Sequence, residues 1–182
     1  MPLASNQPLQ LLGGLTVRQF LRDYWQKRPL LVRNAFPGYV SPVTPEDLAG
    51  LACEENALSR IARYDRANDA WTVRNGPFAE EEFPGMPHQD WTLLVQDVDK
   101  WDPEIRALLG AFDFLPRWRM DDIMISFAAP GGSVGAHIDR YDVFLLQVHG
   151  RRRWRIGPAA HDQRSVSMPR SMLNSSGRAW RW

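Results

Sequence analysis

Apolar positions in the first third of the chain have the spacing of two short helices. Residues 17–25 place apolar side chains three and four positions apart, and they follow Thr16, a residue type that caps helix N-termini. A second helix is predicted from Thr44, with Pro45 at its first position and acidic residues in its first turn, where the helix dipole favours negative charge. Between them, residues 30–32 form a short apolar run that we expect to enter a sheet.

From residue 59 the pattern changes to that of short strands separated by turns. An exposed loop is predicted at 76–90, and Asp102 begins a predicted helix that ends at Leu109. Short strands separated by glycine turns are typical of a sandwich or a barrel. The predicted strands are 59–64, 70–74, 91–96, 122–127, 142–148 and 152–156.

Composition narrows the class of protein. The 182 residues suffice for one domain, and 44% hydrophobic with 24% charged residues is the balance of a globular chain. A net charge of +1 does not indicate a strongly basic nucleic-acid-binding protein. Cys53 is the single cysteine, which excludes an intrachain disulfide and a multi-cysteine zinc site. With no apolar stretch of membrane-spanning length and no signal-peptide pattern, we expect a cytoplasmic protein without membrane contact.

A histidine and an aspartate two residues apart, His137 and Asp139, are the main candidates for chemistry. On a strand, alternate side chains share a face, so both groups can reach one metal ion. With a distant histidine they would complete the facial triad of non-haem Fe(II) oxygenases. The glycine-rich turn at 130–135 would leave space beside the metal. The alternative is a hydrogen bond between the two side chains at a sheet edge.

The basic run Arg151–Arg155 allows three interpretations. It can be a solvated face, a phosphate-binding patch with the interleaved aromatic Trp154, or a source of one arginine for the barrel interior. Alternation would send Arg152 and Trp154 to one face. An interior arginine needs an anion, and a dicarboxylate fits because guanidinium pairs with carboxylate in a two-pronged geometry. Ser126 is either a hydroxyl donor to that carboxylate or an ordinary barrel serine.

Several stretches together resemble the bacterial JmjC-type ribosomal oxygenases, which are arginine hydroxylases of large-subunit ribosomal protein sixteen. The resemblance runs from about residue 9 to 157, and its motifs lie at 25–29, 45–52, 91–96, 121–127, 130–144 and 150–157. It implies an α+β fold in which N-terminal helices pack on a double-stranded β-helix, or cupin, barrel. The implied division is a helix and strand region at 1–90, the first part of the barrel at 91–157, and an irregular tail at 158–182 unlike the family.

The resemblance also implies roles for individual residues. His137 and Asp139 would bind Fe(II), Arg152 would bind the distal carboxylate of the cosubstrate 2-oxoglutarate, and Ser126 would line the site. No catalytic residue beyond the metal ligands is implied. The reaction would couple oxidative decarboxylation of 2-oxoglutarate by O2 to hydroxylation of an arginine side-chain carbon in a ribosomal protein.

The sequence also departs from the family. The third iron ligand, a histidine, lies on a late barrel strand that would fall beyond Trp182. His88, His149 and His161 occupy predicted loops or turns and are not expected to replace it. The dimerisation region of the homodimeric family is also not recognisable. We therefore expect a C-terminally truncated chain with an incomplete barrel that is weakly active or inactive.

Two other functions are compatible with the same residues. One is a non-catalytic RNA- or ribosome-binding module that uses the Arg151–Arg155 cluster. The other is a cupin that binds a metal without 2-oxoglutarate.

Overall fold

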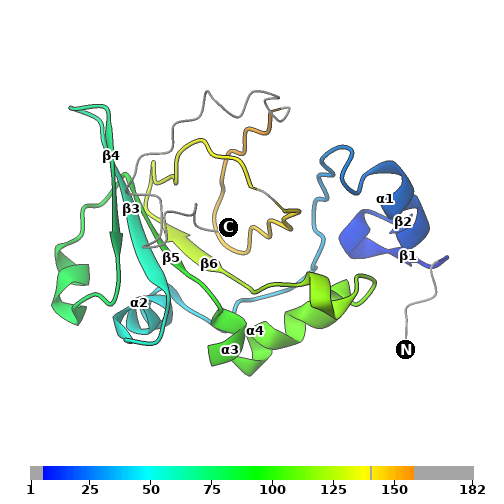
Figure 1. Ribbon diagram of the computed structural model, residues 1–182, viewed down its shortest axis with the longest axis horizontal. Coiled ribbons are helices and arrows are strands. Elements are labelled where there is room, and N and C mark those ends of the chain that lie inside the picture. The colour runs from blue at the N-terminus through cyan, green and yellow to red at the C-terminus, as the bar shows by residue number, and fades with distance from the viewer. Residues whose placement is uncertain (1–5, 140, 158–182) are drawn as a thin grey trace.

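The computed structural model describes residues 6–139 and 141–157 of the chain. Figure 1 shows a small N-terminal unit beside a larger part that is built on one sheet, with residues 141–157 running between the two. In chain order the elements, with η for 3-10 helices, are β1 (Pro8–Leu9), η1 (Gln10–Leu12), β2 (Leu15–Thr16), α1 (Val17–Asp23), α2 (Pro45–Cys53), β3 (Ser59–Asp65), β4 (Ala70–Asn75), η2 (Glu80–Gly85), β5 (Trp91–Val95), α3 (Val98–Trp101), α4 (Pro103–Ala107), η3 (Leu108–Phe112), η4 (Arg117–Arg119) and β6 (Ile125–Ala128).

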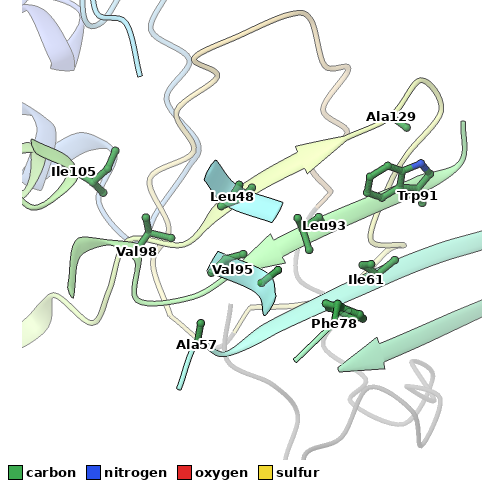
Figure 2. Packing of buried hydrophobic residues seen from close by; sticks show 11 residues of the cluster. Leu48, Ala57, Ile61, Phe78, Trp91, Leu93, Val95, Val98, Ile105 and Ala129 are labelled. Carbon is green, nitrogen blue, oxygen red and sulfur yellow. The ribbon is translucent and has the colours of Figure 1, made fainter. Parts of the chain in front are cut away.

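The main sheet has the strand order β4-β3-β5-β6, and all its neighbours are antiparallel. Strands from before and after residue 90 therefore share one sheet. Ile61, Leu93 and Phe127 lie in one row across β3, β5 and β6. This face packs against Leu48 and Ala52 of α2 and forms the main hydrophobic core. Figure 2 shows this cluster, with Leu48 lying over the sheet beside Leu93.

The opposite face, here called the inner face, carries the polar side chains. Because side chains alternate along a strand, the residues between the core positions point to this face. Its rows across β4, β3, β5 and β6 are Asn75, Arg60, Leu94 and Ser126, followed by Val73, Ala62, Thr92 and Ala128. Any chemistry on this sheet must come from the inner face, because α2 covers the other one.

The N-terminal unit has its own small core of Leu12, Val17 and Phe20. The strands β1 and β2 pair, and α1 begins directly after β2. Thr16 caps α1 in a reciprocal capping box with Gln19, the hydrogen-bonding pattern that its residue type predicts.

Most of the predicted elements are confirmed. Both N-terminal helices are present as α1 and α2, and Thr44 caps α2 with Pro45 at its first turn. The four strands predicted between residues 59 and 127 correspond to β3, β4, β5 and β6. The helix predicted from Asp102 is present as α4 followed by η3.

The predictions of strands at 142–148 and 152–156 are wrong, because both segments lack strand structure. Their apolar side chains are largely exposed, Leu145 at 56% and Ile156 at 66%. A strand is defined by hydrogen bonds to a neighbour, and no described segment pairs with either run. The apolar pattern is present, but a strand also needs a neighbouring strand, which the tertiary structure supplies.

Two smaller predictions also needed correction, and one short helix was not predicted. The apolar run 30–32 does not enter a sheet, and Leu31 is exposed. The loop predicted at 76–90 contains η2 and the buried core residue Phe78. The short helix α3 gave no clear sequence signal. Within the described ranges, no helix has both the length and the apolar character needed to cross a membrane.

Candidate metal and cosubstrate site

A tight turn after β6 leads into the predicted metal ligands. The backbone N–H of Asp90 donates a 2.9 Å hydrogen bond to the carbonyl of Pro130, and the Asp90 carboxylate accepts two 2.6 Å hydrogen bonds from Arg66. These bonds hold the pKa of Asp90 below its usual range. Gly132 packs so closely on the carbonyl of Trp91 that a side chain there would collide with it. The ligand segment is thus anchored to the start of β5.

His137 and Asp139 lie side by side. The His137 Nε2 atom is 3.5 Å from Oδ1 of Asp139, and their side chains are 20% and 29% exposed. Ile138 between them is 44% exposed. The alternation predicted from the sequence is therefore present, although the segment is extended backbone outside any sheet.

The other imidazole nitrogen determines how His137 can act. Its Nδ1 lies 3.0 Å from the carbonyl oxygen of Gly135, and a carbonyl oxygen only accepts hydrogen bonds. Nδ1 therefore carries a proton, and Nε2 faces the Asp139 carboxylate. In neutral imidazole, Nε2 presents a lone pair to the Asp139 carboxyl. A proton shared by the two groups or a metal cation between them relieves the repulsion.

The surroundings favour a cation. Burial raises the pKa of Asp139, and the nearby His137 opposes this shift. Burial and the carboxylates of Asp139, Asp122 and Asp121 raise the pKa of Tyr141 to about 12. The region therefore holds several partly dehydrated anionic groups, and a bound cation would stabilise their charged forms.

The donor set fits a divalent metal such as Fe(II). Two ligands at right angles on an octahedral ion, with bonds of about 2.1 Å, lie roughly 3.0 Å apart. The observed 3.5 Å therefore requires only a small adjustment. Among residues 6–139 and 141–157, no third histidine, cysteine, aspartate or glutamate completes a metal-binding group with them.

The remaining histidines do not change this set. His88 and His149 are described, and neither joins His137 and Asp139 in a metal-binding group. His161 and the tail 158–182 lie outside the described residues.

The two predicted cosubstrate residues occupy separate elements. Ser126 is an exposed residue of β6 on the inner face, in the row of Leu94. Arg152 is partly buried, and its guanidinium carbon lies 5.5 Å from the centre of the Trp154 ring. Arg152 and Trp154 thus lie close together, although the strand on which their shared face was predicted is absent. No hydrogen bond in the described part of the chain joins Arg152 to Ser126.

One inner-face residue was missed by the sequence interpretation. Arg60 of β3 is 4% exposed, yet its pattern of neighbours suggested only an ordinary strand residue. No clear sequence signal marks it, because the burial of Ser59–Ala62 on both faces depends on the tertiary structure.

Comparison with known proteins places these residues in a family context. Residues 107–177 match the JmjC domain family. The matched range ends beyond residue 157, where the resemblance described above ends. A probable ribosomal oxygenase of Haemophilus influenzae is 45% identical over 157 residues, which are 86% of this chain and 38% of that protein. The ribosomal protein uL16 3-hydroxylase of Escherichia coli is 46% identical over 138 residues, 76% of this chain and 36% of the relative.

Solved structures show the same relationship. The structure of YcfD, a ribosomal oxygenase from Escherichia coli, superimposes with a TM-score of 0.65 at 41% identity, covering 69% of this chain and 34% of that one. A second YcfD structure, in complex with cobalt and 2-oxoglutarate, matches with the same TM-score, identity and coverage. The chain thus spans between a third and two fifths of the length of these relatives. It has the JmjC cupin fold over that span, without a closed barrel in the described residues, and over the same span it is similar to proteins named ribosomal oxygenases.

Proposed function

We propose that this chain carries the metal-binding part of an Fe(II)- and 2-oxoglutarate-dependent hydroxylase acting on an arginine of a ribosomal protein. The observation that supports it most directly is the orientation of His137. Its Nδ1 donates to Gly135, and its Nε2 lies 3.5 Å from the Asp139 carboxylate, an arrangement in which both groups can bind one cation. The YcfD structure with cobalt and 2-oxoglutarate supports a metal and this cosubstrate.

Each residue has a separate task in this proposal. His137 and Asp139 hold the metal, which, when bound, activates O2 for oxidation of 2-oxoglutarate and of the substrate. The hydrogen bond to Gly135 fixes the imidazole in the orientation that presents Nε2. Arg152 and Ser126 bind the distal carboxylate of 2-oxoglutarate and thereby orient the cosubstrate.

The substrate assignment has two supports. The Escherichia coli relative is named a ribosomal protein uL16 3-hydroxylase, which supports a ribosomal protein as the substrate. A cytoplasmic reaction is part of the same proposal. The carboxylates of Asp121, Asp122 and Asp139 surround Tyr141, and their negative charge suits a cationic side chain such as arginine.

Metal binding tests the proposal without requiring turnover. Co2+ titration of the full chain, followed by visible absorption, should give saturable binding that His137→Ala and Asp139→Ala each weaken about tenfold or more, roughly 1.4 kcal/mol. His149→Ala is the matched control, because this exposed histidine lies outside the pair. Equal affinities in all four proteins would rule out this metal site.

We expect turnover by this chain to be slow, because two protein ligands leave a metal ion loosely held. Succinate formed from 2-oxoglutarate in the presence of Fe(II) and O2 measures it, and mass spectrometry of an arginine-containing peptide from uL16 detects a gained oxygen. The expected result is a low succinate yield that falls further in His137→Ala. Rapid succinate formation would show that the two-ligand description is incomplete.

The RNA-binding alternative is favoured by one observation. Arg151, Arg153 and Arg155 are exposed beside Trp154, which is 48% exposed, so cationic and aromatic groups share one surface. Fluorescence anisotropy with a single-stranded RNA in EDTA tests it. Salt-dependent binding that disappears when these three arginines become glutamine would support the alternative, and metal-dependent binding would count against it.

A further inference from the structure

Arg60 is a buried cation on the face of the sheet that bears the proposed cosubstrate serine. It lies in the inner-face row between Asn75 of β4 and Leu94 of β5, and Leu94 in turn pairs with Ser126 of β6. Only 4% of the residue is exposed. Two strand spacings, roughly 10 Å, separate the backbones of Arg60 and Ser126.

The Arg60 side chain crosses this gap towards β6. Its Nη2 atom lies 3.7 Å from the sulfur of Met124, which is two residues before Ser126. The guanidinium thus extends past Leu94 to the strand that carries Ser126. An arginine of β3 and a serine of β6 therefore approach the same part of the inner face.

A cavity adjoins Arg60. It has a volume of about 250 Å3, and Glu55, Ser59, Asn75 and Gln96 are among the residues that line it with Arg60. It lies at the β4 side of Arg60, whereas Nη2 extends towards Met124.

The electrostatic setting also suits an anion. Burial lowers the pKa of Arg60 to about 10, even though Tyr141 and Asp122 act in the opposite direction. Burial thus outweighs the nearby negative groups, and an additional anion would stabilise the charged guanidinium.

We propose that Arg60 is a second carboxylate-binding residue of the cosubstrate site, acting on the inner face together with Ser126. This inference rests on the proposed function, because it assigns a further residue to 2-oxoglutarate binding. Arg60 supplies a two-pronged hydrogen-bonding partner for one carboxylate group. The ligand class is a small dicarboxylate.

Binding of 2-oxoglutarate to the full chain with Zn2+ present tests the proposal by isothermal titration calorimetry. Arg60→Met should raise the Kd about tenfold or more, and Arg60→Lys should recover part of the affinity because it restores the charge. Arg63→Met is the matched control, since Arg63 is an exposed arginine of the same strand on the other face. Dimethyl succinate, which lacks carboxylates, should not bind.

The outcomes separate this inference from the proposed function. If Arg152→Met weakens binding while Arg60→Met binds as the unaltered chain does, the inference is overturned and the proposed function stands. If the unaltered chain binds neither 2-oxoglutarate nor succinate, both are overturned.

Weaker binding by Arg60→Met could also result from misfolding of the variant. A measurement on the Arg60 side chain of the unaltered protein separates the two causes. The Nε–Hε resonance of Arg60, assigned by its loss in Arg60→Lys, should shift on addition of 2-oxoglutarate and remain unchanged with dimethyl succinate. A resonance that stays in place at saturating 2-oxoglutarate overturns the inference.

Discussion

Burial determines the behaviour of the charged residues around His137 and Asp139. The pKa values of Asp122 and Asp139 are both raised, because each carboxyl is partly removed from water in a region with other acidic groups. The raised pKa values mean that these two ionised carboxylates weaken the folded state at neutral pH. The proposed metal would stabilise their charged forms.

Asp122→Asn tests whether the charge of Asp122 lowers the free energy of unfolding at neutral pH. Because the pKa of Asp122 is higher in the folded than in the unfolded chain, its stabilising contribution is present below the unfolded value of about 3.9 and is lost as pH rises through the folded value. The amide variant does not titrate, and its oxygen can still accept the 3.0 Å hydrogen bond from the backbone of Asp97. We expect Asp122→Asn to be more stable than the unaltered chain at pH 7 by up to about 1 kcal/mol.

Urea unfolding at pH 4 and pH 7 measures this effect, and the difference between the two proteins should narrow at pH 4. Asp121→Asn is the control, because Asp121 is an exposed neighbour. A variant that is less stable at pH 7 would show that the Asp122 charge stabilises the fold.

The turn between β6 and His137 is the element that aims the metal ligands. It is tied to β5 by the hydrogen bonds from Asp90 to Pro130 and from Ala129 to Trp91. Gly132 packs against the same strand end, without space for a side chain. The glycine-rich stretch, which was expected to leave space beside the metal, is closely packed against β5 at Gly132.

Gly132→Ala should disrupt the packing of the turn against β5. The added methyl group meets the Trp91 carbonyl, so the free energy of unfolding should fall by about 1–3 kcal/mol. Co2+ affinity should fall as well, because the ligand segment shifts. Gly110→Ala is the control, since a side chain at Gly110 meets open space. Thermal unfolding and Co2+ titration of both variants measure these effects. Equal stability and equal Co2+ affinity in the two variants would show that the turn accommodates a methyl group at position 132.

At the scale of the molecule, one aromatic side chain links the site segment to the N-terminal unit. The Phe144 ring lies 4.6 Å from that of Phe112, 5.8 Å from Trp25 and 6.3 Å from Phe20, measured between centroids. Gln26 adds a 2.9 Å hydrogen bond to Asp142. Figure 1 shows residues 141–157 running between the sheet and the N-terminal unit, in keeping with these contacts.

Phe144→Ala should loosen this link. Since Phe144 is 41% exposed, we expect a loss of about 1–2 kcal/mol rather than the larger value for a fully buried ring. Limited proteolysis should then cut within 141–157 sooner. Val143→Ala is the control, because Val143 is similarly exposed and carries no aromatic ring. Unchanged proteolysis in Phe144→Ala would show that other contacts hold the segment.

The local sequence determined those features that depend on neighbours along the chain. Thr16 and Thr44 cap their helices because a hydroxyl at that position reaches the backbone three residues on. The two-residue spacing of His137 and Asp139 brought both to one side even without a strand. Tertiary structure decided the rest, because pairing and burial depend on distant residues. It left 142–148 without a strand partner among the described residues, closed the Gly132 turn onto β5, and brought the Arg60 guanidinium close to Met124, two residues before Ser126.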